Sequence, residues 1–443
     1  MTRLFGTDGI RGVANADLSP KLAYDLGRAT AFHRLGAGGQ LLLGQDTRRS
    51  GDMFAAAVAA GAMSMGTDVY RLGVCPTPAL AHLTAVGPFS AGIMVSASHN
   101  PAIDNGLKVV DEKGMKLDDF VEEEIEALIM RADELVGPHN DGLGREFDAR
   151  GLLEDYVAHR LDLARRVTTD MRVVVDCANG SAGAVASRIL GGTGASVEVR
   201  FNDPDGVNIN DGCGALEPEH VARAVIESGA DIGFALDGDA DRCVAVDERG
   251  QVVDGDQLIG IIAIDRLARD ALPRGIVVAS VLSNGGLQRA IEAAGGQLAR
   301  TPVGDKYIVD GMQVMGAGLG GEKSGHVIVA EHTTSGDGIV TALELLGIVA
   351  RSGRPLSELA AQISLLPQQQ RTVHVRHKDQ WEADPTFAQA VAEASQSLDG
   401  IGRVLVRPSG TEAALRIMVE GEDAGRVTAW ANSLAALAAE RLN

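Results

Sequence analysis

The chain has 443 residues and a net charge of −20, with 45% hydrophobic and 23% charged residues. This composition is typical of a soluble globular protein of roughly three domains, and the negative charge argues against a nucleic-acid or anionic-membrane partner. The lack of an apolar leader or an apolar run of about 18 residues, and 4 widely spaced cysteines, lead us to expect a cytoplasmic protein with reduced thiols.

Short apolar runs alternate with segments of helical period along most of the chain, which predicts βα units with mostly parallel sheets. Residues 41–44 read as a buried strand that leads to an alanine-rich helix over about 53–65. Residues 91–95 form another buried strand, and a polar turn begins where it ends. Ligands of open α/β sheets bind beyond the carboxyl ends of the strands, so this turn is a candidate functional site.

Further along the chain, changes of pattern predict four units. A glycine-containing crossing at 137–142 and a helix over about 152–165 precede the strand 172–176, which indicates a boundary near residue 150. The stretch Pro367–Gln370 reads as the last linker, and a small α+β unit follows it. The first three units are similar in style, and whether they form an internal repeat stays open. The predicted domains are residues 1–150, 151–252, 253–367 and 368–443.

The polar turn after the strand 91–95 contains Ser98, within the segment Ser96–Pro101. A serine hydroxyl is a weak nucleophile unless it is positioned and activated, or already phosphorylated. Pro101 restricts the residue before it to extended geometry, so the turn can hold Ser98 exposed and rigid. The alternative is an ordinary turn with a capping hydroxyl. The segment lacks the G-x-S-x-G pattern, which disfavours a hydrolase with a nucleophile elbow.

Three aspartates alternate along a later segment, at Asp237, Asp239 and Asp241. Their carboxylates can converge on one hard cation, and such oxygens, with phosphate and water, suit Mg²⁺. A calcium-binding EF-hand loop is an alternative, because Glu248 stands at its twelfth position. The sixth position of that loop requires glycine but is Arg242, and the flanking segments 232–236 and 243–246 both read as strands. A solvated acidic turn is the remaining alternative.

The segment after the predicted strand 403–406 carries several anion-binding groups. Arg407 can make bidentate, charge-assisted bonds to a phosphate. Hydroxyl and backbone N–H groups that can complete a cradle follow at Ser409, Gly410 and Thr411. The alternative is a turn with a solvated arginine.

Two further segments add polar groups to this set. Gly320–His326 lies between short predicted strands and offers Glu322 and Ser324 to sugar hydroxyls. Near the N-terminus, the glycine-rich segment Phe5–Gly12 presents Arg11. A nucleophile, a divalent-cation site and a phosphate cradle together indicate phosphoryl transfer on a sugar phosphate.

The chain resembles the α-D-phosphohexomutase superfamily over its whole length. The motifs that carry the resemblance are, in chain order, FGTDGIRG, SASHNP with DNGLK, DGDADR, GEKSGH and RPSGTE. The SAS form of the serine turn and the PSGT form of the cradle resemble the branch that acts on glucosamine phosphates. Ala413 is a departure, since the family commonly has proline after the glutamate; the change can loosen this turn but removes no ligand.

The resemblance implies an α/β fold with three similar mixed α/β domains and a smaller α+β C-terminal domain around a central cleft. It also implies a phosphorylated Ser98 and one Mg²⁺ per active site, with Lys108 as a candidate for proton transfer and Arg11 as a stabiliser of charge. The implied catalytic residues are Ser98, Lys108, Arg11 and His99. The implied metal ligands are Ser98, Asp237, Asp239 and Asp241, and the implied substrate-binding residues are Glu322, Ser324, Arg407, Ser409, Gly410, Thr411 and Arg242.

The reaction that the resemblance implies is an isomerisation of glucosamine 6-phosphate to glucosamine 1-phosphate, through a bisphosphate intermediate, on the route to UDP-N-acetylglucosamine and cell-wall precursors. It also implies a mobile fourth domain and makes a homodimer plausible. Two alternatives stay open. One is the same mechanism on mannose or glucose phosphates, and the other is a catalytically silent sensor that binds a sugar phosphate.

Overall fold

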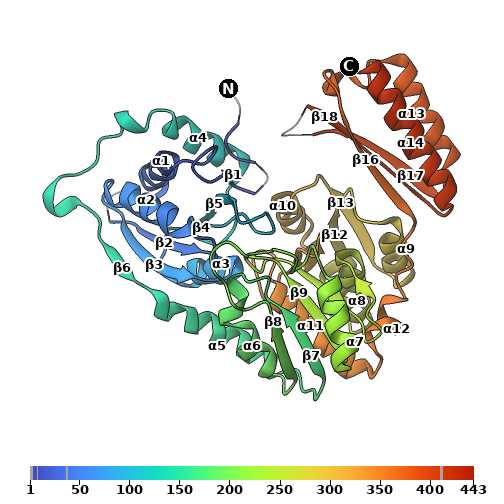
Figure 1. Ribbon diagram of the computed structural model, residues 1–443, viewed down its shortest axis with the longest axis horizontal. Coiled ribbons are helices and arrows are strands. Elements are labelled where there is room, and N and C mark those ends of the chain that lie inside the picture. The colour runs from blue at the N-terminus through green and yellow to red at the C-terminus, as the bar shows by residue number, and fades with distance from the viewer. Residues whose placement is uncertain (1–2, 7, 36–37, 410–412) are drawn as a thin grey trace. The chain divides into compact units, whose positions relative to one another are not determined.

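The computed structural model describes residues 3–6, 8–35, 38–409 and 413–443. These residues form sheets of six, five, four and three strands, which follow one another along the chain (Figure 1). The chain divides into two compact units, one made of residues 1–281 and 295–362 and the other of residues 282–294 and 363–443. No helix within the described residues is long and apolar enough to cross a membrane.

The first sheet has the strand order β1-β5-β4-β2-β3-β6. Strand β2 pairs in parallel with β3 and β4, and β5 then runs antiparallel to β4. The elements of this part of the chain are β1 (Ile10–Val13), α1 (Pro20–Thr30), β2 (Gln40–Gln45), α2 (Gly51–Met63), β3 (Asp68–Val74), α3 (Thr77–Val86), β4 (Ala91–Val95), β5 (Asp104–Asp111), α4 (Asp119–Ile129) and β6 (Glu146–Asp148).

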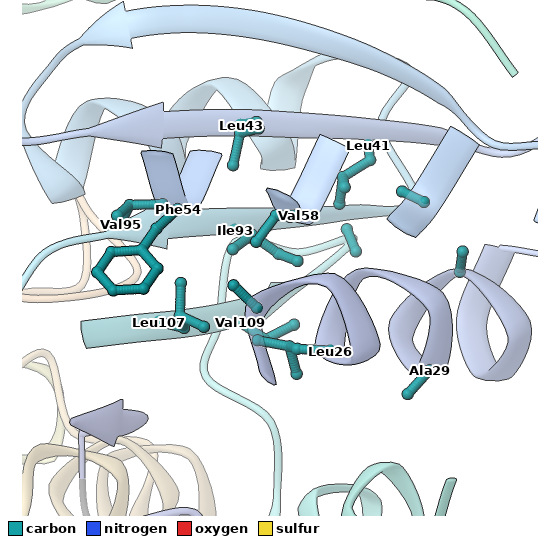
Figure 2. Packing of buried hydrophobic residues seen from close by; sticks show 14 of the residues in the cluster. Leu26, Ala29, Leu41, Leu43, Phe54, Val58, Ile93, Val95, Leu107 and Val109 are labelled. Carbon is teal, nitrogen blue, oxygen red and sulfur yellow. The ribbon is translucent and has the colours of Figure 1, made fainter. Parts of the chain in front are cut away.

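The core of this part lies between the sheet and the helices α1 and α2 (Figure 2). Leu41, Leu42 and Leu43 of β2 are all fully buried. A continuous apolar run is expected for a parallel strand that is covered on both faces, and β2 contacts α2 and α3. The side chains that Figure 2 labels are Leu26 and Ala29 of α1, Phe54 and Val58 of α2, and Leu41, Leu43, Ile93, Val95, Leu107 and Val109 of the strands.

The second and third sheets repeat the topology of the first. The orders β8-β7-β9-β10 and β13-β12-β14-β15 correspond to β3-β2-β4-β5. In each of these sets of four, the first three strands are parallel to one another, and the fourth runs antiparallel to the third. This agreement supports the internal repeat that the sequence left open.

The repeated topology gives three loops the same position, between the last parallel strand and the antiparallel strand. These loops follow β4, β9 and β14, and they contain Ser98, the three aspartates and Glu322–His326 respectively. The elements of the second sheet are α5 (Leu153–Ala164), β7 (Arg172–Asp176), α6 (Ala186–Gly191), β8 (Ser196–Arg200), α7 (Glu219–Ser228), β9 (Ile232–Leu236), β10 (Cys243–Val246) and β11 (Val252–Val253). Those of the third are α8 (Gly255–Ala268), β12 (Ile276–Ser280), β13 (Gln297–Thr301), α10 (Asp305–Met315), β14 (Leu319–Gly321), β15 (Val327–Val329), α11 (Gly338–Ser352) and α12 (Leu356–Ala360). The intervening helix α9 (Gly285–Ala293) belongs to the other compact unit.

The C-terminal unit carries an antiparallel sheet of order β16-β18-β17. The predicted linker Pro367–Gln370 is wrong in this place, because Gln368–Gln370 begin β16 and pair with β18. Uncharged glutamine side chains fit a half-exposed edge strand, so their polarity alone did not mark a linker. The elements are β16 (Gln368–His374), α13 (Pro385–Ser397), β17 (Gly402–Pro408), β18 (Ala414–Gly421) and α14 (Ala424–Arg441).

Candidate active site

Ser98 lies in the turn after β4, and its backbone adopts a positive φ of 54°. Its N–H donates to Ser96 Oγ (2.9 Å), and its carbonyl accepts from Arg48 (3.0 Å) and Asn210 (2.9 Å). Its hydroxyl donates to Asp237 Oδ2 at 2.5 Å. Left-handed backbone at a non-glycine residue is uncommon and concentrates at functional sites. These hydrogen bonds hold the backbone of the turn, but Ser98 is fully buried rather than exposed as expected, because the aspartate loop covers it.

A buried ion pair between Arg48 and Asp46 holds this turn in place. The guanidinium of Arg48 lies 2.9 Å from Asp46 Oδ2, and both side chains are fully buried. The same carboxylate accepts from Ser96 Oγ (2.6 Å). The remaining donors of Arg48 bind backbone carbonyls of the turn, including those of Asn100 (2.8 Å) and Asp104 (3.0 Å). A single side chain therefore fixes several backbone atoms around Ser98.

The aspartate loop lies between β9 and β10 and brings Asp237, Asp239 and Asp241 together. One oxygen of each carboxylate lies within 4.8 Å of the others. Gly238 lets this loop approach the serine turn, since a Cβ there would lie 2.7 Å from the carbonyl oxygen of Ser98. Because the flanking elements are strands, the EF-hand alternative, which needs helices, is wrong.

The aspartate cluster fits a divalent cation. Asp239 Oδ1 and Asp241 Oδ1 are buried and have no hydrogen-bond partner within the described residues. Buried, unpaired carboxylate oxygens are costly unless a cation or donor compensates them. Burial and the charges of Asp241 and Asp239 raise the pKa of Asp237 well above its ordinary value. Three hard oxygen ligands in one buried site match the preference of Mg²⁺.

Lys108 extends from β5 into this cluster. Its Nζ lies 2.7 Å from Asp239 Oδ2, 3.2 Å from Asp8 Oδ2 and 3.5 Å from Asp241 Oδ2. Burial alone would lower the pKa of Lys108, but these carboxylates raise it above its ordinary value. The ammonium form is therefore stabilised, and Lys108 supplies a fixed positive charge beside the aspartates.

Further residues close a ring around the cluster, here called the charged ring, in which acidic side chains alternate with lysine and histidine side chains. Lys116 pairs with Asp8 and, at 2.5 Å, with Asp305. His326 lies 3.6 Å from Asp305 and 3.7 Å from Asp241. Lys108 completes the ring between Asp241 and Asp8. Loops of the first three sheets thus contribute to one polar site.

Two more predicted residues, Arg11 and His99, lie at this site. Arg11 pairs with Asp8 and donates to Asn100 Oδ1 at 3.2 Å. His99 Nδ1 lies 3.2 Å from Ser98 Oγ, and burial, with the charges of Arg242 and Arg11, lowers the pKa of His99 to about 4. At neutral pH this imidazole is therefore uncharged and can accept or donate one hydrogen bond at each nitrogen.

The loop after β14 adds Glu322 and Ser324. Burial alone would lower the pKa of Arg242 in the aspartate loop, but nearby carboxylates, which include Glu322, raise it. The loop after β14 therefore interacts electrostatically with the aspartate loop. Glu322 Oε1 also accepts from the N–H of Gly304 (3.2 Å). The hydroxyl of Ser324 is buried and has no partner within the described residues. It is therefore available to a ligand.

The predicted phosphate cradle belongs to the C-terminal unit. Arg407 lies on β17. Ser409 is buried, its N–H donates to Ala414 O (2.8 Å), and its hydroxyl has no partner in the described part of the chain. Gly410 and Thr411, the other two predicted members, lie outside the described residues.

Matches to known domain families agree with this architecture. They describe phosphoglucomutase/phosphomannomutase α/β/α domain I over residues 2–136, domain II over 154–250, domain III over 254–365 and the C-terminal domain over 372–437. The chain belongs to the phosphoglucomutase/phosphomannomutase family. The family expected from the motifs is confirmed, as is a fold of mixed α/β domains with a smaller C-terminal domain.

Similar proteins within this family are named phosphoglucosamine mutase. That of Moorella thermoacetica is 50% identical over 426 residues, which cover 96% of this chain and 96% of the relative. That of Symbiobacterium thermophilum is 48% identical over 440 residues, or 98% of each chain. A crystal structure of a phosphoglucomutase/phosphomannomutase family protein from Burkholderia thailandensis superposes with a TM-score of 0.84 at 25% identity, covering 100% of this chain and 99% of that one.

Several residues of this mutase-family site were not found from the sequence. Thr77 at the start of α3 donates to Asp239 Oδ2 at 2.6 Å, and Asp8, Lys116, Asp305 and Asn210 also contact the site or its turn. Only Asp8 lies within a motif, FGTDGIRG, that signalled it. The others are ordinary polar residues at the first position of a helix or in loops, and their partners are distant in the sequence.

Proposed function

We propose that the protein is a phosphoglucosamine mutase, which interconverts glucosamine 6-phosphate and glucosamine 1-phosphate through phospho-Ser98 and a bisphosphate intermediate. The observation that carries the proposal is the Ser98 hydroxyl, 2.5 Å from Asp237 within a buried aspartate cluster. Nearly full-length relatives of that name, 48% and 50% identical, support the choice of sugar.

In the first half-reaction, the bond between phosphorus and Ser98 Oγ breaks while a bond to the 1-oxygen of glucosamine 6-phosphate forms. The sugar hydroxyl loses its proton to a neighbouring base, and the serine oxygen takes up a proton. In the second half-reaction the 6-phosphoryl group bonds to Ser98 by the reverse exchange, and glucosamine 1-phosphate remains. Because the phosphoryl group is the only group transferred, catalysis depends on positioning and on stabilising negative charge.

Asp237, Asp239, Asp241 and the phosphate on Ser98 would hold Mg²⁺, which supplies positive charge to the transferring phosphoryl group when bound. Arg48 and Asn210 fix the backbone of Ser98 through its carbonyl oxygen. The position of the seryl oxygen is thus set before substrate binds, so the serine turn need not reorganise during phosphoryl transfer.

The cationic residues at the site also stabilise the negative charge of the transferring phosphoryl group. Lys108, the sequence-based candidate for proton transfer, is held as an ammonium by its carboxylate neighbours. We therefore assign it, with Arg11 and Arg242, to stabilising the phosphoryl oxygens. His99, beside the seryl oxygen and uncharged at neutral pH, orients that oxygen by a hydrogen bond.

Two sets of residues would bind the rest of the substrate. Glu322 and Ser324 would hydrogen-bond to the sugar, and the cradle would hold the phosphate that is not reacting. The cradle residues in this proposal are Arg407, Ser409, Gly410 and Thr411. An Arg407→Ala variant should mainly raise KM, and an unchanged KM would contradict this assignment.

³¹P NMR tests the proposed function directly. The protein is given Mg²⁺, a trace of glucose 1,6-bisphosphate, and equal amounts of glucosamine, glucose and mannose 6-phosphates. We expect glucosamine 1-phosphate to appear first, and Ser98→Ala to abolish conversion while Ser352→Ala on α11 retains it. Preferential formation of glucose or mannose 1-phosphate would overturn the substrate. No conversion by a protein that carries phospho-Ser98 would favour a silent sensor.

The homodimer that the resemblance makes plausible is tested by sedimentation velocity with the same preparation. A single species of twice the chain mass is expected, and a monomer at all concentrations would contradict it. Catalysis as proposed uses residues of one chain only, so this result does not bear on the reaction.

A further inference from the structure

Asp239 of the aspartate cluster is held by a residue from a distant part of the chain, Thr77. Thr77 is the first residue of α3, and it is 7% exposed. Its hydroxyl donates to Asp239 Oδ2 at 2.6 Å, and its N–H donates to the carbonyl oxygen of Asp239 at 2.9 Å. Thr77 therefore binds both the side chain and the backbone of one member of the cluster, 162 residues away in the sequence.

The two oxygens of the Asp239 carboxylate differ in their partners. Oδ2 accepts from the Thr77 hydroxyl and also from the Lys108 ammonium at 2.7 Å. Oδ1 is buried and has no hydrogen-bond partner within the described residues. Since a carboxylate oxygen has two lone pairs, the two donors occupy Oδ2, whereas Oδ1 keeps its capacity to bind a cation.

Of the two donors, Thr77 is the one that fixes the orientation of the carboxylate. The Lys108 ammonium also lies 3.2 Å and 3.5 Å from two other carboxylates, so it supplies charge to the whole cluster. Thr77 has a single O–H on a short, β-branched side chain with few rotamers. Its backbone is restricted as well, because Pro76 and Pro78 flank it and α3 packs against β2 and β4.

We propose that Thr77 is a positioning residue that confines Asp239 to one cation-binding oxygen, Oδ1, and thereby makes the cluster select Mg²⁺ over Ca²⁺. This inference rests on the proposed function, which assigns the cluster to Mg²⁺. Mg²⁺ demands near-ideal octahedral geometry, whereas Ca²⁺ accepts a flexible shell and carboxylates that bind through one or both oxygens. A carboxylate whose second oxygen is occupied by donors fits the stricter geometry of Mg²⁺ and excludes the two-oxygen contact that Ca²⁺ can use.

Electron paramagnetic resonance of Mn²⁺ tests the proposal with the full chain. Binding lowers the signal of the free ion, and competition by Mg²⁺ or Ca²⁺ gives the Kd of each ion. Treatment with a phosphatase beforehand gives every variant the same unmodified Ser98. We expect the natural chain to bind Mn²⁺ saturably and Mg²⁺ to displace it at a lower concentration than Ca²⁺. Asp239→Asn should weaken this binding, which assigns the signal to the cluster.

Thr77→Val keeps the shape of the side chain and removes its O–H. We expect the Kd for Mg²⁺ to rise about tenfold, as for other residues that orient a metal ligand. The Kd for Ca²⁺ should rise by no more than about threefold, because the released carboxylate can bind Ca²⁺ through both oxygens. Thr77→Ala should give the same shift, and Thr77→Ser, which keeps a hydroxyl, should restore both values. Thr84→Val is the matched control, since Thr84 is a buried residue of α3 whose hydroxyl donates to Leu80 O at 2.8 Å.

Three outcomes would overturn the inference. A lower Tm with unchanged Kd values in Thr77→Val, as expected for Thr84→Val, would mean that the Thr77 hydroxyl is only structural. Equal rises in Kd for Mg²⁺ and Ca²⁺ would mean that it does not set the selectivity. If the natural chain and Asp239→Asn bind Mn²⁺ alike, the assignment of the cluster to Mg²⁺ in the proposed function fails too. The measurement does not use turnover, so a different sugar phosphate as substrate would not change its outcome.

Discussion

The loops that follow β4 and β14 occupy the same position in two sheets of the same topology, but they differ in how their polar atoms are paired. In the first, the N–H, carbonyl and hydroxyl of Ser98 all have hydrogen-bond partners. In the second, the hydroxyl of Ser324 is buried and has no partner within the described residues. Since buried polar groups are almost always paired, the first loop is complete by itself and the second is complete only with a ligand.

This difference shows what the repeated topology decides and what it leaves to side chains. A loop between parallel and antiparallel strands lies at the carboxyl end of the parallel strands, where ligands bind in α/β sheets. The topology therefore gives three equivalent loops one location. Their side chains then divide the chemistry, with a fixed hydroxyl in one loop, carboxylates in the next and unpaired hydrogen-bonding capacity in the third.

The largest expected effect tests whether the β4 loop depends on its buried anchor. Arg48→Met leaves Asp46 buried and uncompensated and frees the carbonyls of the turn, so we expect a loss of about 3–5 kcal/mol in the free energy of unfolding. Chemical denaturation measures it. Arg150→Met is the matched control. Arg150 also pairs with the aspartate two residues before it, Asp148, at 2.6 Å, but both of these side chains are exposed. Equal losses in the two variants would contradict the comparison.

The next effect concerns the loop after β9, whose carboxylates we propose as ligands of Mg²⁺. Free Mg²⁺ at a hundredfold excess over its Kd should stabilise the fold by about 2.7 kcal/mol, seen as a rise in Tm. Asp239→Asn should diminish this rise. Asp247→Asn should keep it, because Asp247 is also buried but pairs with backbone N–H groups of the following turn. A rise of equal size in Asp239→Asn would contradict the assignment of the aspartate cluster as the metal site.

Ser324→Ala sharpens the comparison for the β14 loop. The hydroxyl makes no hydrogen bond to the described residues, so stability should hardly change, while KM for glucosamine 6-phosphate should rise about tenfold. Thr193→Val is the opposite control. Its hydroxyl donates to Leu190 O at 2.6 Å away from the site, so its loss should lower stability and leave KM unchanged. A stability loss in Ser324→Ala would mean that the hydroxyl has a protein partner.

The smallest effect extends the comparison to the helix that leads into β4. Burial, with the charges of Arg160 and His159, lowers the pKa of His82 on α3 to about 4. In the unfolded chain the histidine pKa is about 6.5, so as the pH falls His82 is protonated in the unfolded chain before it is protonated in the folded one. Stability from neutral His82 is therefore complete above pH 6.5 and falls as the pH falls towards 4, by about 1 kcal/mol after allowance for partial exposure.

Tm measured between pH 4.5 and 7.5 checks this prediction. His82→Gln should show a smaller decline at acid pH than the natural chain. His374→Gln, at an exposed position of β16, should follow the natural chain. Parallel curves for all three proteins would show that His82 does not contribute.

Much of the fold was accessible from the sequence because its signals are local. The strands 91–95, 172–176, 232–236 and 243–246 match β4, β7, β9 and β10, since short, mainly apolar runs favour buried strands. The predicted linker at Pro367–Gln370 failed because a polar segment can pair at the edge of a sheet, and pairing depends on β18, about 50 residues later.

The motifs alone determined the family and, within the first compact unit, several of the groups that lie around the aspartate cluster, because each motif is contiguous and its residue types are specific to phosphate and metal chemistry. Only the tertiary structure decided how those groups are held. The charged ring joins Asp8, Lys116 and Asp305, and the anchor Arg48 binds carbonyls about 50 residues away. Such pairs carry no local pattern, because ion pairs and buried hydrogen bonds depend on distances that exist only after distant segments have packed together.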